Sequence, residues 1–167
     1  GDTLLIFDAQ NALIPASNGA TFDVRAGGST NAEQFPVLDF DDTSDEFADW
    51  RAVMPQHYDG GGLTCVITWS AESATSGTVE WEIAFRRIEN DNEDIDSAHT
   101  YDFNANNDTT ASAAGEVVQT TITFTDGADM DSIAVGEMFM MRVARDPDGT
   151  DTVVGDAELH TVEIRET

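Results

Sequence analysis

The sequence predicts an all-β fold, an antiparallel β-sandwich of jelly-roll type with about 8–11 strands and at most one short helix. Three features predict it. Apolar and polar residues alternate along many short segments, as in strands that bury one face. Turn residues separate these segments at nearly regular spacing. No part of the chain shows the succession of strand and helix that builds a doubly wound parallel sheet.

The clearest alternation lies in residues 61–88, GGLTCVITWSAESATSGTVEWEIAFRRI. We expect a hairpin here, with strands over 63–70 and 78–88 joined by a small polar loop. Trp69 and Trp81 each lie at one of the alternate positions of their strand that carry apolar residues. We therefore expect both rings to enter the core from neighbouring strands.

The other strands follow the same pattern. They are expected at 3–8, 20–26, 35–41, 46–55, 99–104, 116–125, 138–146 and 158–166, of which 99–104 has the weakest pattern. Only residues 126–137 suggest a helix, and the glycines at both ends limit it to about one turn. The apolar residues at alternate positions of these strands are expected to share one face and form the core: Trp69, Trp81, Ile67, Ile83, Phe85, Ile122 and Phe124.

No internal repeat or linker divides the chain, so residues 1–167 are expected to form a single β-sandwich domain. We favour a jelly roll over an immunoglobulin-like sandwich, because the chain is long for the latter and lacks its Cys–Trp–Cys pattern. The single cysteine, Cys65, has apolar parity within its strand and is expected to be a buried small hydrophobe.

The charge balance is extreme: 33 acidic residues stand against seven basic ones, all arginine, for a net charge of −26. Such a surface argues against nucleic-acid binding, which needs a basic patch, and against anionic membranes. No apolar run is long enough to span a bilayer, and no signal peptide is evident in the chain as given. Concentrated salt screens the self-repulsion of so many carboxylates. The complete absence of lysine therefore favours a protein that works in brine.

Motifs for catalysis are absent: there is no glycine-rich phosphate loop, GxSxG elbow or HExxH motif. The three histidines, His57, His99 and His160, lie far apart in sequence. Glu80 and Glu82 share one strand face and could serve glycoside hydrolysis. A solvated outer face is the simpler interpretation of this pair. We therefore predict no enzymatic activity and no catalytic residues.

Two acidic loops offer oxygen ligands for a hard cation such as Ca²⁺. Residues 91–96, DNEDID, form one, and residues 146–151, DPDGTD, form the other, with Asp146, Asp148 and Asp151 as candidate ligands. Neither loop matches the EF-hand pattern. Pairing of the second loop with Arg142 or Arg145 is the alternative that we prefer, because both arginines are near in sequence. No cofactor is expected beyond such a structural Ca²⁺.

Aromatic residues suited to stacking on sugars are scarce. Tyr58 and Tyr101 lie beside expected loops, whereas Trp50 shares an apolar parity and is expected to be buried. Asn107 begins an N-x-T glycosylation sequon in a polar stretch. It would be the acceptor in an extracellular setting whose host glycosylates asparagine.

The order of several strings resembles that of a family of virion structural proteins of tailed phages and related viruses. They are VLDFDDTSDE, then VMPQHYDGGGLTCVITWSAESATSG, VEWEIAFRRI and DIDS, and finally the segment from ITFTDGADMDS to AELHTVEI. The resemblance covers about residues 35 to 165 and implies a β-rich capsid decoration, turret or tail-appendage module without catalytic residues. The lysine-free composition departs from such proteins and points to a virus of a halophilic host, such as an archaeon.

These observations give three function hypotheses. The first is a non-enzymatic structural protein of an extracellular virion, stable in high salt. Its partners would be other virion proteins and copies of itself, with a trimer favoured and neither nucleic acid nor membrane bound. The second is a carbohydrate-binding or receptor-binding β-sandwich module that recognises a glycan. The third is a glycosidase or other hydrolase, which would need a cleft with two carboxylates about 5–9.5 Å apart.

Overall fold

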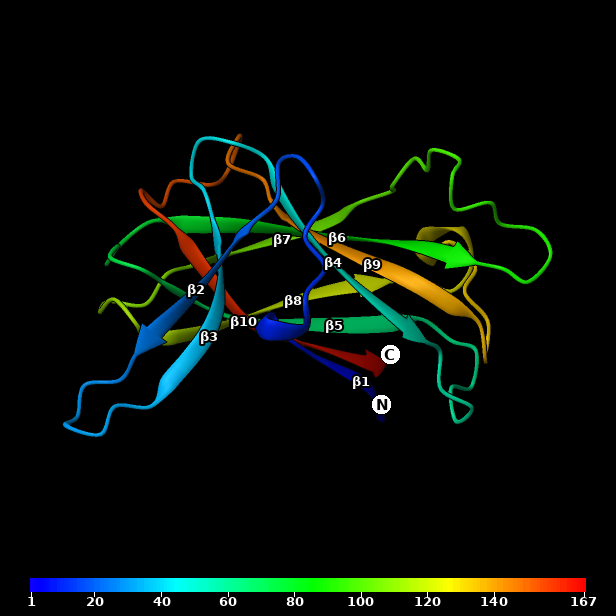
Figure 1. The fold of residues 1–167 in the computed structure, drawn as a ribbon, viewed down its shortest axis with the longest axis horizontal. Helices are drawn as coiled ribbons and strands as arrows, with labels where there is room; N and C mark the ends of the chain where they lie inside the picture. Colours follow the sequence, from blue (N-terminus) through cyan, green and yellow to red (C-terminus); the bar gives the residue numbers. More distant parts are fainter.

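The computed structural model describes all residues, 1–167, and shows two antiparallel sheets packed face to face (Figure 1). Sheet A has the strand order β2-β3-β10-β5-β8, and β1 pairs with the C-terminal part of β10. Its strands are β1 (Thr3–Asp8), β2 (Thr21–Ala26), β3 (Gln34–Phe40), β5 (Leu63–Ala71), β8 (Val117–Phe124) and β10 (Ala157–Glu166).

Sheet B has the order β4-β9-β6-β7. Its strands are β4 (Glu46–Val53), β6 (Thr78–Ile88), β7 (Asn104–Thr109) and β9 (Met138–Arg145). The structure confirms the predicted jelly-roll β-sandwich: the strands are antiparallel, and consecutive strands repeatedly cross from one sheet to the other. Two single-turn 3-10 helices, η1 (Ala9–Asn11) and η2 (Ala128–Met130), are the only helices, and η2 falls in the segment where one turn was predicted.

The core fills the space between the sheets. All seven predicted core residues are buried, with at most 2% of their surface exposed, and Trp50 and Cys65 are buried as expected. The predicted hairpin of residues 61–88 is wrong, because β5 pairs with β10 and β8 in sheet A, whereas β6 pairs with β9 and β7 in sheet B. The two tryptophans therefore meet across the core, with the Trp69 and Trp81 ring centroids 6.1 Å apart.

Strand β7 was not predicted; a strand was expected at 99–104 instead. Residues 99–103 form a loop, and the strand is the polar segment Asn104–Thr109 at the edge of sheet B. It has no apolar face; the backbone ladder to β6 and amide side chains that reach β8 hold it in place. Asn104 and Asn106 donate hydrogen bonds of 2.9 and 2.8 Å to the carbonyls of Thr123 and Thr121 on β8, which joins the two sheets at this edge.

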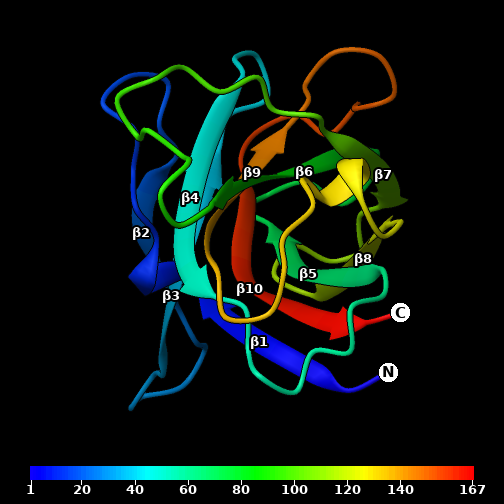
Figure 2. The ribbon, with the colours of Figure 1, turned by 90° about the vertical axis from the view of Figure 1, so that its right-hand side faces the viewer.

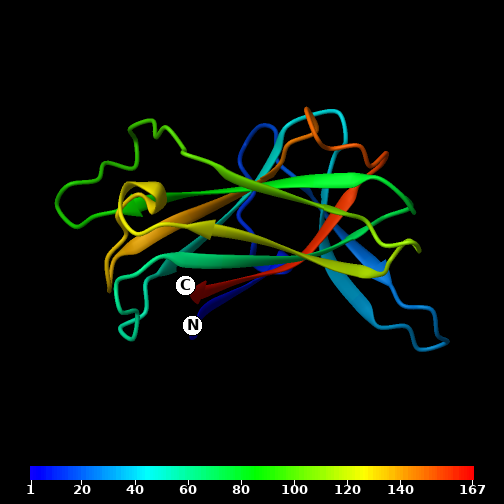
Figure 3. The same ribbon diagram turned by 180° about the vertical axis from the view of Figure 1, so that it is seen from behind.

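The loops gather at the two ends of the sandwich. Connections 54–62, 89–103 and 125–137 lie at the end that faces the viewer in Figure 2. The β2–β3 hairpin projects from the opposite end (Figure 3). The chain termini lie side by side, since Thr3 of β1 pairs with Arg165 of β10. No helix of the structure is long and apolar enough to cross a membrane.

Candidate functional site

The outer face of sheet A carries a pocket of about 470 Å³ close to the β2–β3 hairpin. Four strands of the sheet and the start of a fifth supply its walls. The lining residues are Arg25, Ala26, Gly27, Gly28, Phe35, Thr68, Ala114, Gly115, Glu116, Val117, His160 and Thr161. The volume lies within the range of about 300–1,000 Å³ that is usual for small-ligand sites.

An aromatic pair forms the apolar wall of this pocket. Phe35 lies on β3 and 43% of its surface is exposed, which is unusual for phenylalanine. Its ring meets the imidazole of His160 edge to face, with centroids 6.4 Å apart and an interplanar angle of 77°. Both residues point away from the core because they have the opposite parity to the buried Leu38 and Leu159 of the same strands.

A chain of hydrogen bonds under the pocket fixes His160. Its Nε2 lies 2.8 Å from the Ser70 hydroxyl, and Ser70 donates a 3.0 Å hydrogen bond to the Glu158 carboxylate. Because the hydroxyl proton is used for Glu158, His160 must donate through Nε2, which leaves Nδ1 as an acceptor. Burial lowers the pKa of His160 against the opposing effect of Glu158, so the imidazole is neutral at pH 7.

Arg25 is held just as firmly. Its Nη1 donates to Glu158 at 2.7 Å and to the carbonyls of Ala71 and Glu72 at 3.3 and 3.1 Å. Gly115 makes room for it: this residue has a φ of +86°, and a Cβ there would lie 2.7 Å from the Arg25 guanidinium. Any other residue at 115 would therefore be strained and would displace the arginine. The pocket thus offers a guanidinium whose position is set before any ligand arrives.

The arrangement suits binding rather than hydrolysis. Ser70 is fully buried, and Glu158 contacts Ser70 instead of the histidine, so Ser70, His160 and Glu158 do not form a nucleophilic triad. What the pocket presents is an exposed phenyl ring, a neutral imidazole acceptor and fixed guanidinium donors. These groups fit a ligand with one apolar face and several hydroxyl groups.

Asp39 and Glu158 form a cross-strand pair of carboxylates beside this hydrogen-bond chain. Asp39 pairs in register with Glu158, is only 9% exposed, and its Oδ1 has no hydrogen-bond partner. Burial, and then the neighbouring carboxylates of Asp23, Asp156 and Glu158, raise the pKa of Asp39 from the ordinary 3.8 to about 8. At neutral pH Asp39 therefore keeps a proton, which it can share with Asp23.

Asp39→Asn is expected to stabilise the protein at alkaline pH. The folded pKa lies above the unfolded one, so the folded state keeps a proton that the unfolded state loses between about pH 4 and pH 8. Stability therefore falls as the pH rises through this window, and asparagine, which cannot ionise, removes the loss. We expect a gain of more than about 1 kcal/mol at pH 8 that vanishes near pH 4, measured by urea unfolding.

Asp102→Asn is the control, because it makes the same charge change at an exposed position. Equal effects of the two substitutions at pH 8 would show that general charge repulsion, and not the Asp39 proton, sets the pH dependence.

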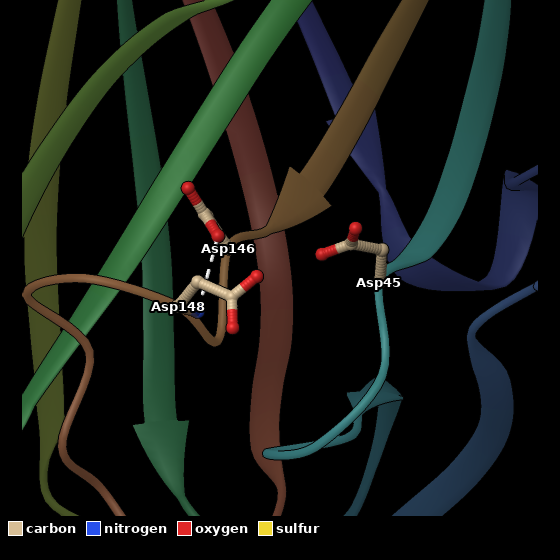
Figure 4. A group of neighbouring side chains, drawn as sticks. All are labelled: Asp45, Asp146 and Asp148. Atoms are coloured by element: carbon tan, nitrogen blue, oxygen red, sulfur yellow. Dashed lines mark hydrogen bonds between the residues drawn. The ribbon is translucent and has the colours of Figure 1, made fainter.

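The predicted metal ligands do not come together as a set. Asp151 turns inward and forms a buried ion pair with Arg145, with Nη2 and Oδ1 2.8 Å apart. The predicted pairing of this loop with a nearby arginine is thus confirmed only for Asp151, which pairs with Arg145. Arg142 pairs with Asp49 instead. Asp146 and Asp148 instead face Asp45, and one carboxylate oxygen from each of the three lies within 4.8 Å of the others (Figure 4).

This acidic cluster continues onto β6. Burial, and then the charges of Asp146, Glu80 and Asp45, raise the pKa of Glu82 to about 7. Glu80 and Glu82 therefore belong to one concentration of negative charge with Asp146 and Asp45 rather than to an isolated pair. The sequence missed Asp45 because it lies about 100 positions away. Calcium binding in this loop, predicted with Asp146, Asp148 and Asp151 as ligands, stays a prediction, and the structure replaces Asp151 by Asp45 in the cluster.

The remaining sequence candidates have structural roles or lie apart from the pocket. Arg86 anchors the 91–96 loop through Glu93 and the carbonyls of Asp94 and Ser97. Tyr58 is buried, and Asn107 is exposed on β7. The pocket residues Phe35 and His160 were missed as site residues. The alternation in QFPVLDF could have indicated Phe35, because it places Phe35 on the same strand face as Asp39 and on the opposite face from Leu38.

No protein-family model matches the chain, and no curated protein matches it. Solved structures do. The chain has the fold of carbohydrate-binding modules: a family 35 module from Clostridium thermocellum superposes with a TM-score of 0.58 at 10% identity, covering 100% of both chains. The CBM22-1 xylan-binding domain of Paenibacillus barcinonensis Xyn10C gives 0.54 at 12% identity, covering 99% of this chain and 95% of the other. The CBM22-2 xylan-binding domain of the same enzyme gives 0.54 at 10% identity, covering 98% and 99%.

Proposed function

We propose that this protein is a non-catalytic carbohydrate-binding module that takes a neutral glycan into the pocket on the outer face of sheet A. One observation carries the proposal: a preformed pocket with an exposed phenyl ring lies on a jelly roll whose structural relatives, along their whole length, include xylan-binding domains. This is the second function hypothesis from the sequence. The relatives favour it over the virion role and over a hydrolase.

The chemistry of a sugar ring matches that of the pocket walls. The C–H face of a pyranose is apolar and would pack on Phe35, which removes both surfaces from water. A ring hydroxyl would donate to Nδ1 of His160, and another would accept from Arg25. Because Arg25 and His160 are already held by Glu158 and Ser70, binding immobilises few side chains of the protein.

The acids around the pocket favour a neutral ligand. Glu116 lies in its wall, Glu158 contacts Arg25, and Asp23 adds a negative charge beside the protonated Asp39. Glu158 already neutralises the positive charge of Arg25 in an ion pair of 2.7 Å. A glycan that carries a carboxylate would therefore meet net repulsion here.

Affinity electrophoresis and isothermal titration against neutral polysaccharides, xylan first, test the proposal. Phe35→Ala is expected to weaken binding by at least about tenfold, since burying a phenyl side chain contributes about 1.5–3 kcal/mol. Phe22→Ala is the matched control, because Phe22 is another exposed phenylalanine (51%) that lies on β2 outside the pocket. Equal affinities of wild type and Phe35→Ala, or binding to none of the polysaccharides, would contradict the proposal.

A place in a virion is compatible with this function, since a glycan-binding module can serve as the receptor-binding part of a particle. The virion location, the trimer and the halophilic host stay predictions of the sequence resemblance and of the lysine-free composition.

A further inference from the structure

A second pocket, of about 320 Å³, lies on the outer face of sheet B, on the other side of the sandwich. Its lining is unusual for this chain, because three of the seven arginines occur there. The lining residues are Asp49, Arg51, Arg86, Ile88, Ile95, Tyr101, Met138, Met140 and Arg142. We call it the arginine groove.

The strand register explains how the arginines meet. Arg51 of β4 and Arg86 of β6 both pair with Met140 of β9, so they flank this methionine on the outer face. Their Cα atoms are thus two strand spacings, about 10 Å, apart, which is within the reach of two arginine side chains. Arg142 lies two positions further along β9, and the Met138 and Met140 side chains form an apolar floor.

Two of the arginines are fixed, and both keep free donors. Arg142 binds Asp49 through Nε and Nη2 at 2.8 and 2.9 Å and stacks under Tyr101, with Cζ 4.7 Å from the ring centroid. Arg86 binds Glu93 and two loop carbonyls through Nε and Nη2. In both residues the Nη1 group makes no hydrogen bond.

The third arginine has no partner. Arg51 is exposed and forms neither an ion pair nor a side-chain hydrogen bond. Glu93 pairs with Arg86, and Asp131 lies near Tyr101, both outside the lining. Three arginines and one carboxylate, that of Asp49, line the groove, in a protein whose net charge is −26. The groove is therefore a local exception to the charge of the whole surface, and an anion is the ligand that would complement it.

We propose that the arginine groove binds the sulfate ester of a sulfated sugar, with the sugar ring on the apolar floor. The free donors come from three separate side chains, which suits the three terminal oxygens of a tetrahedral sulfate better than a planar carboxylate. The volume suits one sugar ring. A polyacidic peptide would bring many charges towards a surface that is negative on nearly all sides, whereas a sulfated sugar unit brings one. This proposal does not depend on the pocket of sheet A.

Isothermal titration with a monosulfated disaccharide tests the proposal, with the desulfated disaccharide and a uronate-containing disaccharide of equal charge as reference ligands. We expect the sulfated sugar to bind, and both reference ligands to bind at least about tenfold more weakly. Arg51→Ala should weaken the binding of the sulfated sugar by a similar factor. Arg165→Ala, which removes the same charge from a partly exposed arginine on sheet A, should leave its affinity unchanged.

Each other outcome overturns the proposal. No binding of the sulfated sugar, or equal binding by wild type and Arg51→Ala, would exclude this groove as the site. Tighter binding of the uronate, or of a polyglutamate peptide, would exclude a sulfate ester as its ligand. Phe35→Ala is expected to keep full affinity for the sulfated sugar, so failure here is distinguishable from failure of the neutral-glycan site on sheet A.

Discussion

Arg145→Ala is expected to destabilise the protein by about 3–5 kcal/mol, because it leaves a buried carboxylate without its counter-charge. Arg145 is fully buried and Asp151 almost so, with 0% and 2% of their side chains exposed. The guanidinium donates two 2.8 Å hydrogen bonds to Asp151. It also donates to the carbonyls of Phe40, Val153 and Gly155 at 3.1, 2.7 and 2.8 Å. All five acceptor atoms lose this donor in the variant, and Asp151 Oδ2 keeps only the Glu80 N–H, at 3.0 Å.

Equilibrium urea unfolding measures this loss, with Arg165→Ala as the partly exposed control, expected to change stability by less than about 0.5 kcal/mol. If Arg145→Ala does not fold, the double variant Arg145→Met with Asp151→Leu keeps the prediction testable. Replacing both partners with apolar residues removes the unpaired charge and is expected to restore a folded protein. A loss below about 1 kcal/mol for Arg145→Ala would contradict the buried pair.

Trp81→Ala is expected to cost about 3–5 kcal/mol through lost burial and the cavity that remains. The Trp81 ring is fully buried between the sheets, 5.1 Å from the Phe40 centroid and 6.1 Å from that of Trp69. Thermal and urea unfolding at one salt concentration measure the change.

Trp81→Phe is the matched variant. The indole Nε1 of Trp81 is buried without a hydrogen-bond partner, so phenylalanine removes an unsatisfied donor while it keeps an aromatic ring. We expect this substitution to cost less than half as much as alanine. Trp69 differs, because its Nε1 donates to Thr120 at 2.9 Å. Similar costs for Trp81→Phe and Trp81→Ala would show that ring packing is not what Trp81 contributes.

Much of the fold could be predicted from the sequence, because a strand that buries one face alternates apolar and polar residues with a period of two. This is why β5, β6 and β9 were found nearly to the residue. Parity does not say which strand is the neighbour, so the segment 61–88 was interpreted as a hairpin although its strands lie in opposite sheets. The polar strand β7 has no apolar face and left no periodic signal.

Less of the candidate site could be predicted. Asp146 and Asp148 were near each other in sequence, but their neighbour Asp45 precedes a distant strand, and Asp151 is separated from them by its buried pair. The pocket on sheet A depends on side chains from five strands. Its hydrogen-bond chain joins residues up to 133 positions apart, which no local pattern reveals.

Chemical-shift mapping tests the central claim, a neutral-glycan site on the outer face of sheet A, most directly. Isotope-labelled protein would be titrated with a neutral oligosaccharide of the polymer that it binds, xylan first. We expect the largest amide shifts at Gly27, Phe35, Thr68, Gly115 and His160, which meet only at this pocket. A saturating titration that leaves these amides unmoved, or that moves only residues of sheet B, would contradict the account.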